Sequence, residues 1–242
     1  MLKYTVYYLG HSAWMVETDE RCMIFDYGEG RGGTGGPEAG VVNLNDFSSK
    51  QIFLFFSHSH HDHYDKKLHK TAEETGKAVT VLGGFGASAG NTFSLIPRTE
   101  REIAGVIVSA AASTDAGACF LVKAGGLAIY HGGDNADWGD GDLKNKRYSG
   151  EIDYLADQAG KAHIAFIPVC TFTGKQPEDM LEGALYSLNK LAPENAFPMH
   201  ANGREFLYEK FAAYTRNKGY CGKIICMKSP GESKVFTTSD AG

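Results

Sequence analysis

The sequence predicts a mixed α/β protein, with two packed sheets that carry helices on their outer faces. Short runs of branched and aromatic residues, separated by Gly and Asp, indicate strands. Longer runs with apolar residues three or four positions apart indicate helices. Along the chain, strands come first, then one helix and more strands, and finally helices and strands in alternation. This order fits two sheets packed together with helices outside.

The first third of the chain is predicted to form strands followed by one helix. The strand-forming runs are Lys3–Leu9, Ala13–Glu17, Met23–Asp26 and Ile52–Phe56. The polar segment Asp65–Thr75 has Leu68 and Ala72 at helical spacing. Gly76 follows it and is a suitable C-terminal cap, so the helix is expected to end there.

Residues 27–45 lie between two of these strands and hold seven glycines. A phosphate cradle needs glycines in a set spacing at a turn from strand to helix, with a helix behind them. No helical pattern follows this segment. A surface loop lying over the functional site is therefore the favoured interpretation, with a phosphate cradle and plain disorder as the alternatives.

The rest of the chain is predicted to return to strands and then to alternate. The strand-forming runs are Val79–Leu82, Arg101–Val108, Ala118–Lys123, Leu127–His131, His163–Pro168 and Ile224–Met227. The helical runs are Ile152–Ala159, Pro177–Leu191 and Arg204–Arg216. The helix from Pro177 has the clearest pattern, because proline opens it and Glu178 and Asp179 lie in its first turn.

Composition limits the classes of protein to which the chain can belong. Its 242 residues are 43% hydrophobic, which suffices for a sizeable core in a single domain, residues 1–242. The net charge is −5 and no Lys/Arg run is present, which argues against nucleic acid as the partner because phosphate backbones require a basic stripe. No apolar stretch approaches the roughly 18 residues that a membrane span requires. The sequence gives no indication of an oligomeric state.

The cysteines indicate a reducing compartment. They are Cys22, Cys119, Cys170, Cys221 and Cys226, an odd number without a Cys-x-x-Cys pair. Most lie among apolar residues, which is typical of small buried side chains. A cytoplasmic protein is therefore expected.

The most informative segment is Ser57–Asp65, which reads SHSHHDHYD and directly follows the strand-forming run Ile52–Phe56. Imidazole and carboxylate groups are preferred ligands for zinc and similar divalent ions. A histidine-rich patch can also bind metal adventitiously. A cluster this dense behind a buried strand is different, because its polar groups would be costly to bury unless something satisfied them.

The spacing within this segment separates its side chains into two groups. In an extended segment, residues two apart share a face, so His58 and His60 can bind one ion. Asp62 and His63 follow where the chain turns and can serve a second ion. His61 lies between the ligands on the opposite face and is not expected to bind.

The pattern His-x-His-x-Asp-His resembles the signature of the metallo-β-lactamase-fold hydrolases. Three further segments follow in family order: Tyr8–Trp14, Leu127–Asp134 and Ala196–His200. The first resembles the subgroup related to ascorbate-6-phosphate lactonase and ribonuclease Z. The others resemble the segments that carry the bridging aspartate and the last histidine. The resemblance spans roughly residues 8–200 and implies a four-layer αβ/βα sandwich.

The resemblance implies two metal sites that share Asp134. The ligands would be His58, His60 and Asp134 at the first site, and Asp62, His63, Asp134 and His200 at the second. Two ions that share a carboxylate lie about 3.5–4 Å apart. Asp62 is also placed to accept a proton, which makes it the candidate catalytic residue.

The chain departs from the family at one position. By register, Ser113 stands where the family supplies a further histidine to the first site. A neutral hydroxyl is a poor zinc ligand, so we expect two sites of unequal affinity or one ion alone. Asp115 and His131 are candidate replacement ligands, and His131 or His11 can alternatively orient a ligand or line the pocket.

These features predict an enzyme that hydrolyses a small ester, lactone or phosphoester with a metal-activated water. Zinc is the first choice of metal, with manganese and iron as alternatives. A bound divalent ion lowers the pKa of water from about 15.7 to near 7. One alternative is a ribonuclease Z-like RNA-processing nuclease, which the lack of a basic arm disfavours. Another is a non-catalytic metal-binding or ligand-sensing domain, which Ser113 makes plausible.

Overall fold

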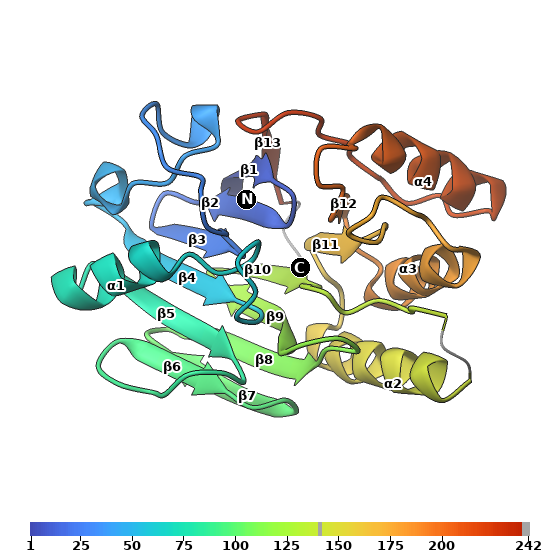
Figure 1. Ribbon diagram of the computed structural model, residues 1–242, viewed down its shortest axis with the longest axis horizontal. Coiled ribbons are helices and arrows are strands. Elements are labelled where there is room, and N and C mark those ends of the chain that lie inside the picture. The colour runs from blue at the N-terminus through green and yellow to red at the C-terminus, as the bar shows by residue number, and fades with distance from the viewer. Residues whose placement is uncertain (140–141, 239–242) are drawn as a thin grey trace. The chain divides into compact units, whose positions relative to one another are not determined.

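A computed structural model describes residues 1–139 and 142–238 of the chain (Figure 1). By its internal contacts the chain divides into two compact units. The first unit contains Met1–Leu95 and Lys228–Gly242, and the second contains Ile96–Met227. Each unit is built on one sheet. The expected single domain of residues 1–242 stays a prediction.

The first unit contains a seven-stranded sheet among its described residues, in the order β13-β1-β2-β3-β4-β5-β6. Its strands are β1 (Lys3–Gly10), β2 (Ala13–Glu17), β3 (Arg21–Phe25), β4 (Gln51–Phe56), β5 (Ala78–Gly83), β6 (Thr92–Leu95) and β13 (Ser233–Thr237). The strands from β13 to β3 are antiparallel, and those from β3 to β6 are parallel. Helix α1 (Lys66–Thr75) packs against β5, and two 3₁₀ turns, η1 (Pro37–Ala39) and η2 (Leu44–Phe47), lie between β3 and β4.

Strands β3 and β4 position the first half of the candidate site. They run parallel with Phe25 opposite Phe55, so the residues that follow them emerge at the same edge of the sheet. Strand β4 is buried from Ile52 to Phe56, as expected for a central parallel strand. Apolar side chains on one face of the sheet form a core with residues of η2 and α1, including Phe47 and Ala72.

The second unit contains a six-stranded sheet among its described residues, in the order β12-β11-β10-β9-β8-β7. Its strands are β7 (Thr99–Ile103), β8 (Val106–Ala112), β9 (Ala118–Ala124), β10 (Leu127–His131), β11 (Ile164–Pro168) and β12 (Asn195–Met199). The strands from β7 to β10 are antiparallel, and β10, β11 and β12 are parallel. The segments after these three parallel strands therefore emerge at one edge of the sheet.

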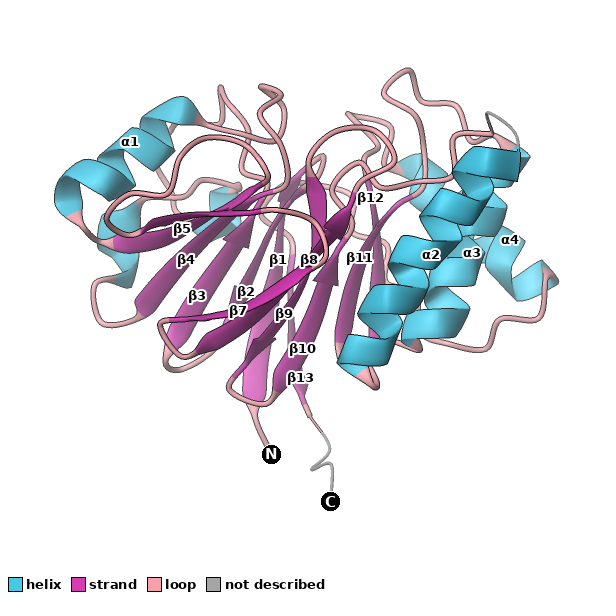
Figure 2. Ribbon diagram, turned by 90° about the horizontal axis from the view of Figure 1, so that it is seen from below, coloured by secondary structure: helices cyan, strands magenta, loops and turns pink. Residues whose placement is uncertain are grey.

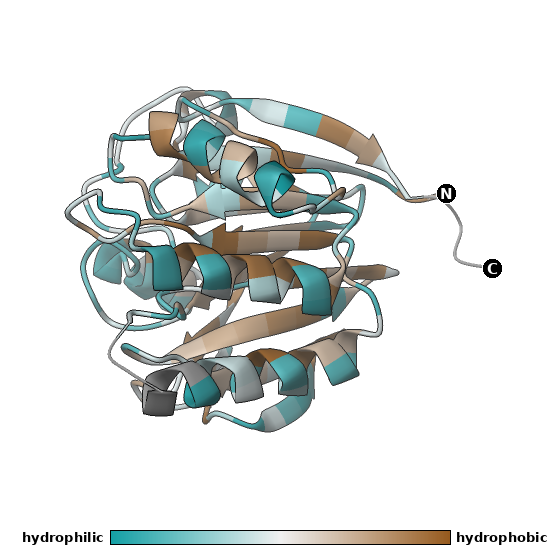
Figure 3. Cartoon of the chain, turned by 90° about the vertical axis from the view of Figure 1, so that its right-hand side faces the viewer, coloured by the Kyte–Doolittle hydropathy of each residue, from teal (hydrophilic) through white to brown (hydrophobic). Residues whose placement is uncertain are grey.

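Three helices cover this second sheet side by side (Figure 2). Helix α2 (Asp142–Ala159) packs against β8 and β9, α3 (Glu178–Leu191) against β11, and α4 (Phe206–Asn217) against β12. Figure 3 shows hydrophilic and hydrophobic residues in alternation along the helices, and mainly hydrophobic residues in the strands behind them. This pattern is that of amphipathic helices on an apolar sheet. No described helix has the length and apolar character that a bilayer span requires.

The structure corrects several predicted elements. The predicted strand Ile224–Met227 is wrong, since Ile224 makes only an isolated bridge to Ala196. The final strand is β13, which is mostly exposed and therefore lacks an apolar signal. The predicted strand Arg101–Val108 is two strands, because Ala104 and Gly105 both have positive φ and form a turn. Strand β6 was not predicted, and α2 begins ten residues before Ile152.

The contact between α2 and α3 contains a buried hydrogen-bonded tyrosine. The Tyr148 hydroxyl lies 3.1 Å from the Gly183 carbonyl oxygen and 2.6 Å from Ser187 Oγ. We expect Tyr148→Phe to lower the free energy of unfolding by about 1–2 kcal/mol, because it leaves a buried acceptor without its donor. Urea denaturation measures this. Tyr154→Phe on the same helix is the control and should change stability little, since no hydrogen bond is recorded for that hydroxyl among the described residues.

Candidate metal centre

The loop after β4 brings four histidine and aspartate side chains of the motif to the edge of the first sheet. His58 and His63 are buried, whereas His60 is exposed. His58 Nε2 lies 3.0 Å from His60 Nδ1. Asp65 is not part of this group, because its Oδ1 accepts the backbone N–H groups of Lys67 and Leu68 and caps α1.

A buried carboxylate fixes the ring orientation of two of these histidines. Asp26, which directly follows β3, accepts the backbone N–H of Ser57 on Oδ1 at 2.7 Å. Its Oδ2 accepts both Ser57 Oγ–H and His63 Nδ1–H, each at 2.7 Å. Because the Ser57 proton goes to Asp26, Ser57 Oγ accepts from His58 Nδ1–H at 2.9 Å. The Nε2 atoms of His58 and His63 are therefore left as lone-pair donors for a metal.

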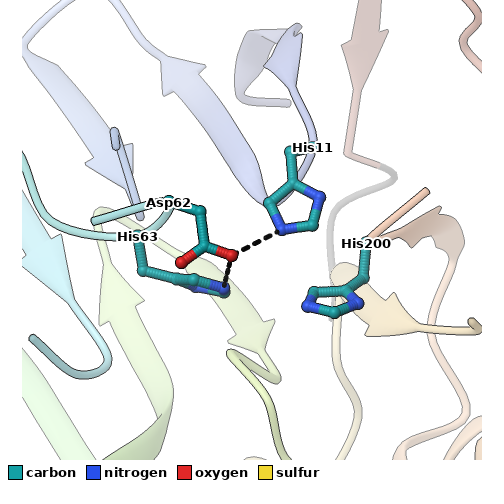
Figure 4. Close-up of side chains that lie close together, drawn as sticks. All are labelled: His11, Asp62, His63 and His200. Carbon is teal, nitrogen blue, oxygen red and sulfur yellow. Dashed lines mark ion pairs between the residues drawn. The ribbon is translucent and has the colours of Figure 1, made fainter. Parts of the chain in front are cut away.

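Asp62 lies between two imidazoles of the first unit (Figure 4). Its Oδ2 is 3.3 Å from His11 Nε2 and 3.7 Å from His63 Nε2. Burial tends to raise the pKa of Asp62, but the hydrogen bond from His11 and the electrostatic effect of the neighbouring His63 ring outweigh it and hold the pKa well below its ordinary value. Asp62 is therefore ionised at neutral pH.

The glycine-rich loop, residues 27–45, contacts the backbone of the segment that carries Asp62. Glu29 N–H donates to the His61 carbonyl at 2.7 Å, and Asp65 N–H donates to the Tyr27 carbonyl at 2.9 Å. Between these bonds, Gly28 lies directly against the backbone of Asp62, and a Cβ at Gly28 would be 2.2 Å from the Asp62 carbonyl oxygen. This part of the loop therefore positions the motif, and the expectation that the loop lies over the functional site stays a prediction.

The second unit contributes a further histidine and carboxylate. His200, after β12, and Asp134, after β10, are both buried, and His200 Nε2 lies 3.2 Å from Asp134 Oδ1. His200 Nδ1–H donates to the Cys170 carbonyl at 2.8 Å, while the Cys170 thiol contacts the His200 carbonyl at 3.0 Å. These bonds hold His200 at a positive φ of 75°.

The donor chemistry of both units fits a divalent metal. In each, an imidazole Nε2 atom faces a carboxylate oxygen: His63 faces Asp62, and His200 faces Asp134. Two lone-pair atoms at such distances repel unless a cation or an added proton lies between them. This geometry is therefore suited to a metal ion.

A family profile described as the beta-lactamase superfamily domain matches residues 5–200 of the chain. The chain belongs to the β-lactamase superfamily. A UPF0173 metal-dependent hydrolase of Opitutus terrae is 26% identical, with 93% of this chain and 97% of that protein covered. Its counterpart in Pyrococcus furiosus is also 26% identical, with 96% and 99% covered.

A solved structure of a metallo hydrolase from Ignicoccus hospitalis has the same fold. Its TM-score is 0.64 at 19% identity, with 98% of this chain and all of that chain covered. The likeness confirms the expected fold class, the αβ/βα sandwich of the β-lactamase superfamily. Together the comparisons support the expected enzyme class, a metal-dependent hydrolase.

The position at which this chain departs from the β-lactamase superfamily pattern is buried and hydrogen-bonded. Ser113 is buried after β8, and its Oγ accepts the backbone N–H of Asp115 at 3.2 Å. The side chain of Asp115 is exposed, and among the described residues it makes no recorded contact to Asp134. His131 is buried, with its Nδ1 accepting the Gly133 N–H at 3.2 Å.

The sequence analysis did not identify two groups that orient the histidines, the Asp26 carboxylate and the Cys170 carbonyl. Asp26 was predicted as the end of a strand without a role, and the Cys170 carbonyl carries no side-chain signal. An acidic residue directly after a buried strand was the signal available for Asp26. His61 is exposed, as His60 is, and the expectation that His61 does not bind metal stays a prediction.

Proposed function

We propose that residues 1–242 act as one domain in which donors from both units hold one or two divalent ions and hydrolyse a small ester, lactone or phosphoester. The proposed ligands are His58, His60, Asp62, His63, Asp134 and His200. The second unit supplies two of these, Asp134 and His200, which is fewer than the four ligands that a zinc site takes, or the three that a catalytic zinc site takes from the protein. The order of these ligands along the chain follows the resemblance to the family.

The observation that carries the proposal is the fixed orientation of the histidines. The Nδ1–H groups of His63 and His200 donate to Asp26 and to the Cys170 carbonyl, respectively. Metal-binding histidines are held in this way, because the second nitrogen must present its lone pair. A purely structural role would not account for two buried histidines whose Nε2 atoms both face carboxylates.

The proposed chemistry divides between the ion and the protein. A bound ion, for which zinc is the first choice and manganese or iron the alternatives, lowers the pKa of water and polarises the scissile group. Asp62 Oδ2 accepts the proton that the attacking water releases. His11 Nε2, at 3.3 Å from that oxygen, orients the carboxylate. Ser113 offers no nitrogen ligand, so the two sites are expected to differ in affinity.

A metal titration of matched variants tests this proposal. The purified protein is stripped of metal and titrated with zinc and manganese by calorimetry, and turnover of phosphodiester, lactone and ester substrates is measured. We expect His63→Ala to lose at least about tenfold in metal affinity and to lose turnover. His61→Ala, a change of the same type in the same loop, should behave as the unchanged protein.

The results separate the candidates. Turnover that survives His63→Ala would disprove the proposed centre, and two tight sites of equal affinity would disprove the unequal occupancy. Ser113 favours one second candidate, a non-catalytic metal-binding domain. Tight binding that His63→Ala abolishes, without turnover of any substrate, would support that candidate. The net charge of −5 supports a small molecule as the substrate, in preference to RNA.

A further inference from the structure

A short loop of the second unit follows the residue that orients His200. Residues 171–175 lie between β11 and α3, directly after Cys170. Thr171 N–H donates to the Lys175 carbonyl at 2.8 Å, and Lys175 N–H donates to Thr171 Oγ1 at 3.0 Å. The loop is thus closed on itself and presents a defined surface.

Arg204 lies across this loop. A Cβ at Gly174 would be 2.2 Å from Arg204 Cδ and 2.7 Å from Arg204 Nε, so the arginine stem passes directly over the glycine. Gln176 Nε2 donates to the Val169 and Leu207 carbonyls, both at 3.1 Å, which ties the loop to the first turn of α4. The arginine is therefore held in place by packing.

The charge of Arg204 has no ion-pair partner among the residues that the structure describes. Its side chain is nevertheless half-buried. Lys175, in the loop beneath, also makes no recorded ion pair within residues 1–139 and 142–238. Burial, and then the charge of Glu205, raise the pKa of the Cys170 thiol to about 12, and the charge of Arg204 acts against this rise. The guanidinium field therefore reaches the residue whose carbonyl orients His200.

Two exposed aromatic side chains lie in the segments that meet at Arg204. The described residues include five large hydrophobic side chains that are exposed, and two of them are Phe172 and Phe206, at 53% and 57%. One lies in the loop and the other is two residues after Arg204. A cation in a region with exposed apolar side chains suits an organic acid better than a free inorganic ion.

We infer that Arg204, assisted by Lys175, binds an anionic group of the substrate, a phosphate or a carboxylate carried on an apolar body. This inference rests on the proposed function, because it places the charged end of the substrate beside the segment that carries His200. Arginine is suited to this role because its planar fork matches both anions with two hydrogen bonds.

The kinetic test compares two esters that differ in charge. The metal-loaded protein is assayed with neutral p-nitrophenyl acetate and with anionic mono-p-nitrophenyl glutarate. We expect Arg204→Gln to raise KM for the anionic ester about tenfold, the effect of losing one charge-assisted hydrogen bond, and to leave the neutral ester unchanged. Arg204→Lys should restore part of the loss. Equal effects on both esters, or none, would overturn the inference.

Arg216→Gln is the matched control for charge. Arg216 is exposed in the last turn of α4 and has no recorded ion pair among the described residues, so its removal changes the net charge of the protein by the same amount as the removal of Arg204. Both esters should be turned over by this variant as by the unchanged protein. A rise in KM for the anionic ester equal to that of Arg204→Gln would assign the effect to general charge and contradict a specific contact.

A binding measurement keeps this inference separate from the proposed function. Dissociation constants of phenyl phosphate and benzoate are measured by calorimetry on the metal-loaded protein and on Arg204→Gln, after thermal melts establish that the variant is folded. We expect about tenfold weaker binding of the preferred anion to the variant. The tighter of the two identifies phosphate or carboxylate as the group. If no substrate is turned over, the proposed function alone is contradicted. If each anion binds to Arg204→Gln as tightly as to the unchanged protein, the anion site is contradicted.

Discussion

Gly28→Ala is expected to lower metal affinity and turnover about 100-fold, the effect of displacing a catalytic group by roughly 1 Å. The added Cβ would lie 2.2, 2.4 and 2.9 Å from the carbonyl oxygen, carbonyl carbon and Cα of Asp62. These are backbone atoms, so no side-chain rotation relieves the contact. Hydrogen bonds on both sides of Gly28 tie the two segments together, so the strain must move the Asp62 loop.

The measurement is a zinc titration by calorimetry together with urea denaturation. Gly28 does not have a positive φ, so the substitution tests the contact and not the backbone conformation. Gly32→Ala is the matched control, because a Cβ there meets no atom within 4 Å. The control should bind metal as the unchanged protein does. Unchanged affinity in Gly28→Ala would show that the loop does not position Asp62.

Asp26→Ala is expected to lower the free energy of unfolding by roughly 3–5 kcal/mol, because each buried donor left without an acceptor costs about 1–3 kcal/mol. Its carboxylate accepts hydrogen bonds from the Ser57 backbone, the Ser57 hydroxyl and His63 Nδ1, all at 2.7 Å. Alanine leaves three buried donors without an acceptor. Metal affinity should fall 10- to 100-fold, because His58 and His63 lose their fixed orientation.

Asp26→Asn separates the structural from the orienting effect. An amide retains one oxygen for His63 but replaces the other acceptor by an NH₂ group that faces the Ser57 N–H. We expect a smaller loss of stability than with alanine and a clear loss of metal affinity, measured by urea denaturation and calorimetry. Asp19→Asn, at an exposed position, controls for net charge. Asp26→Ala with unchanged stability and affinity would show that this carboxylate is dispensable.

Much of the fold was predictable because its strands and helices carry local patterns. The central strand Ile52–Phe56 and the helices at Pro177 and Arg204 have apolar spacing that indicates both their type and their buried faces. Strand β13 was missed for the opposite reason. It lies at the edge of its sheet with mostly exposed side chains, so its pairing with β1 leaves no apolar signal.

The candidate ligands of the metal centre were determined by the sequence alone, because the pattern from His58 to His63 places metal-binding side chains at fixed short spacing. The tertiary structure decided how those side chains are oriented. Asp26 and Ser57 are 31 positions apart, and they meet because β3 and β4 run parallel and end at one edge. Gly28 likewise meets Asp62 only through the folded loop. Hydrogen bonds that set a tautomer depend on distance in space, which spacing along the chain does not encode.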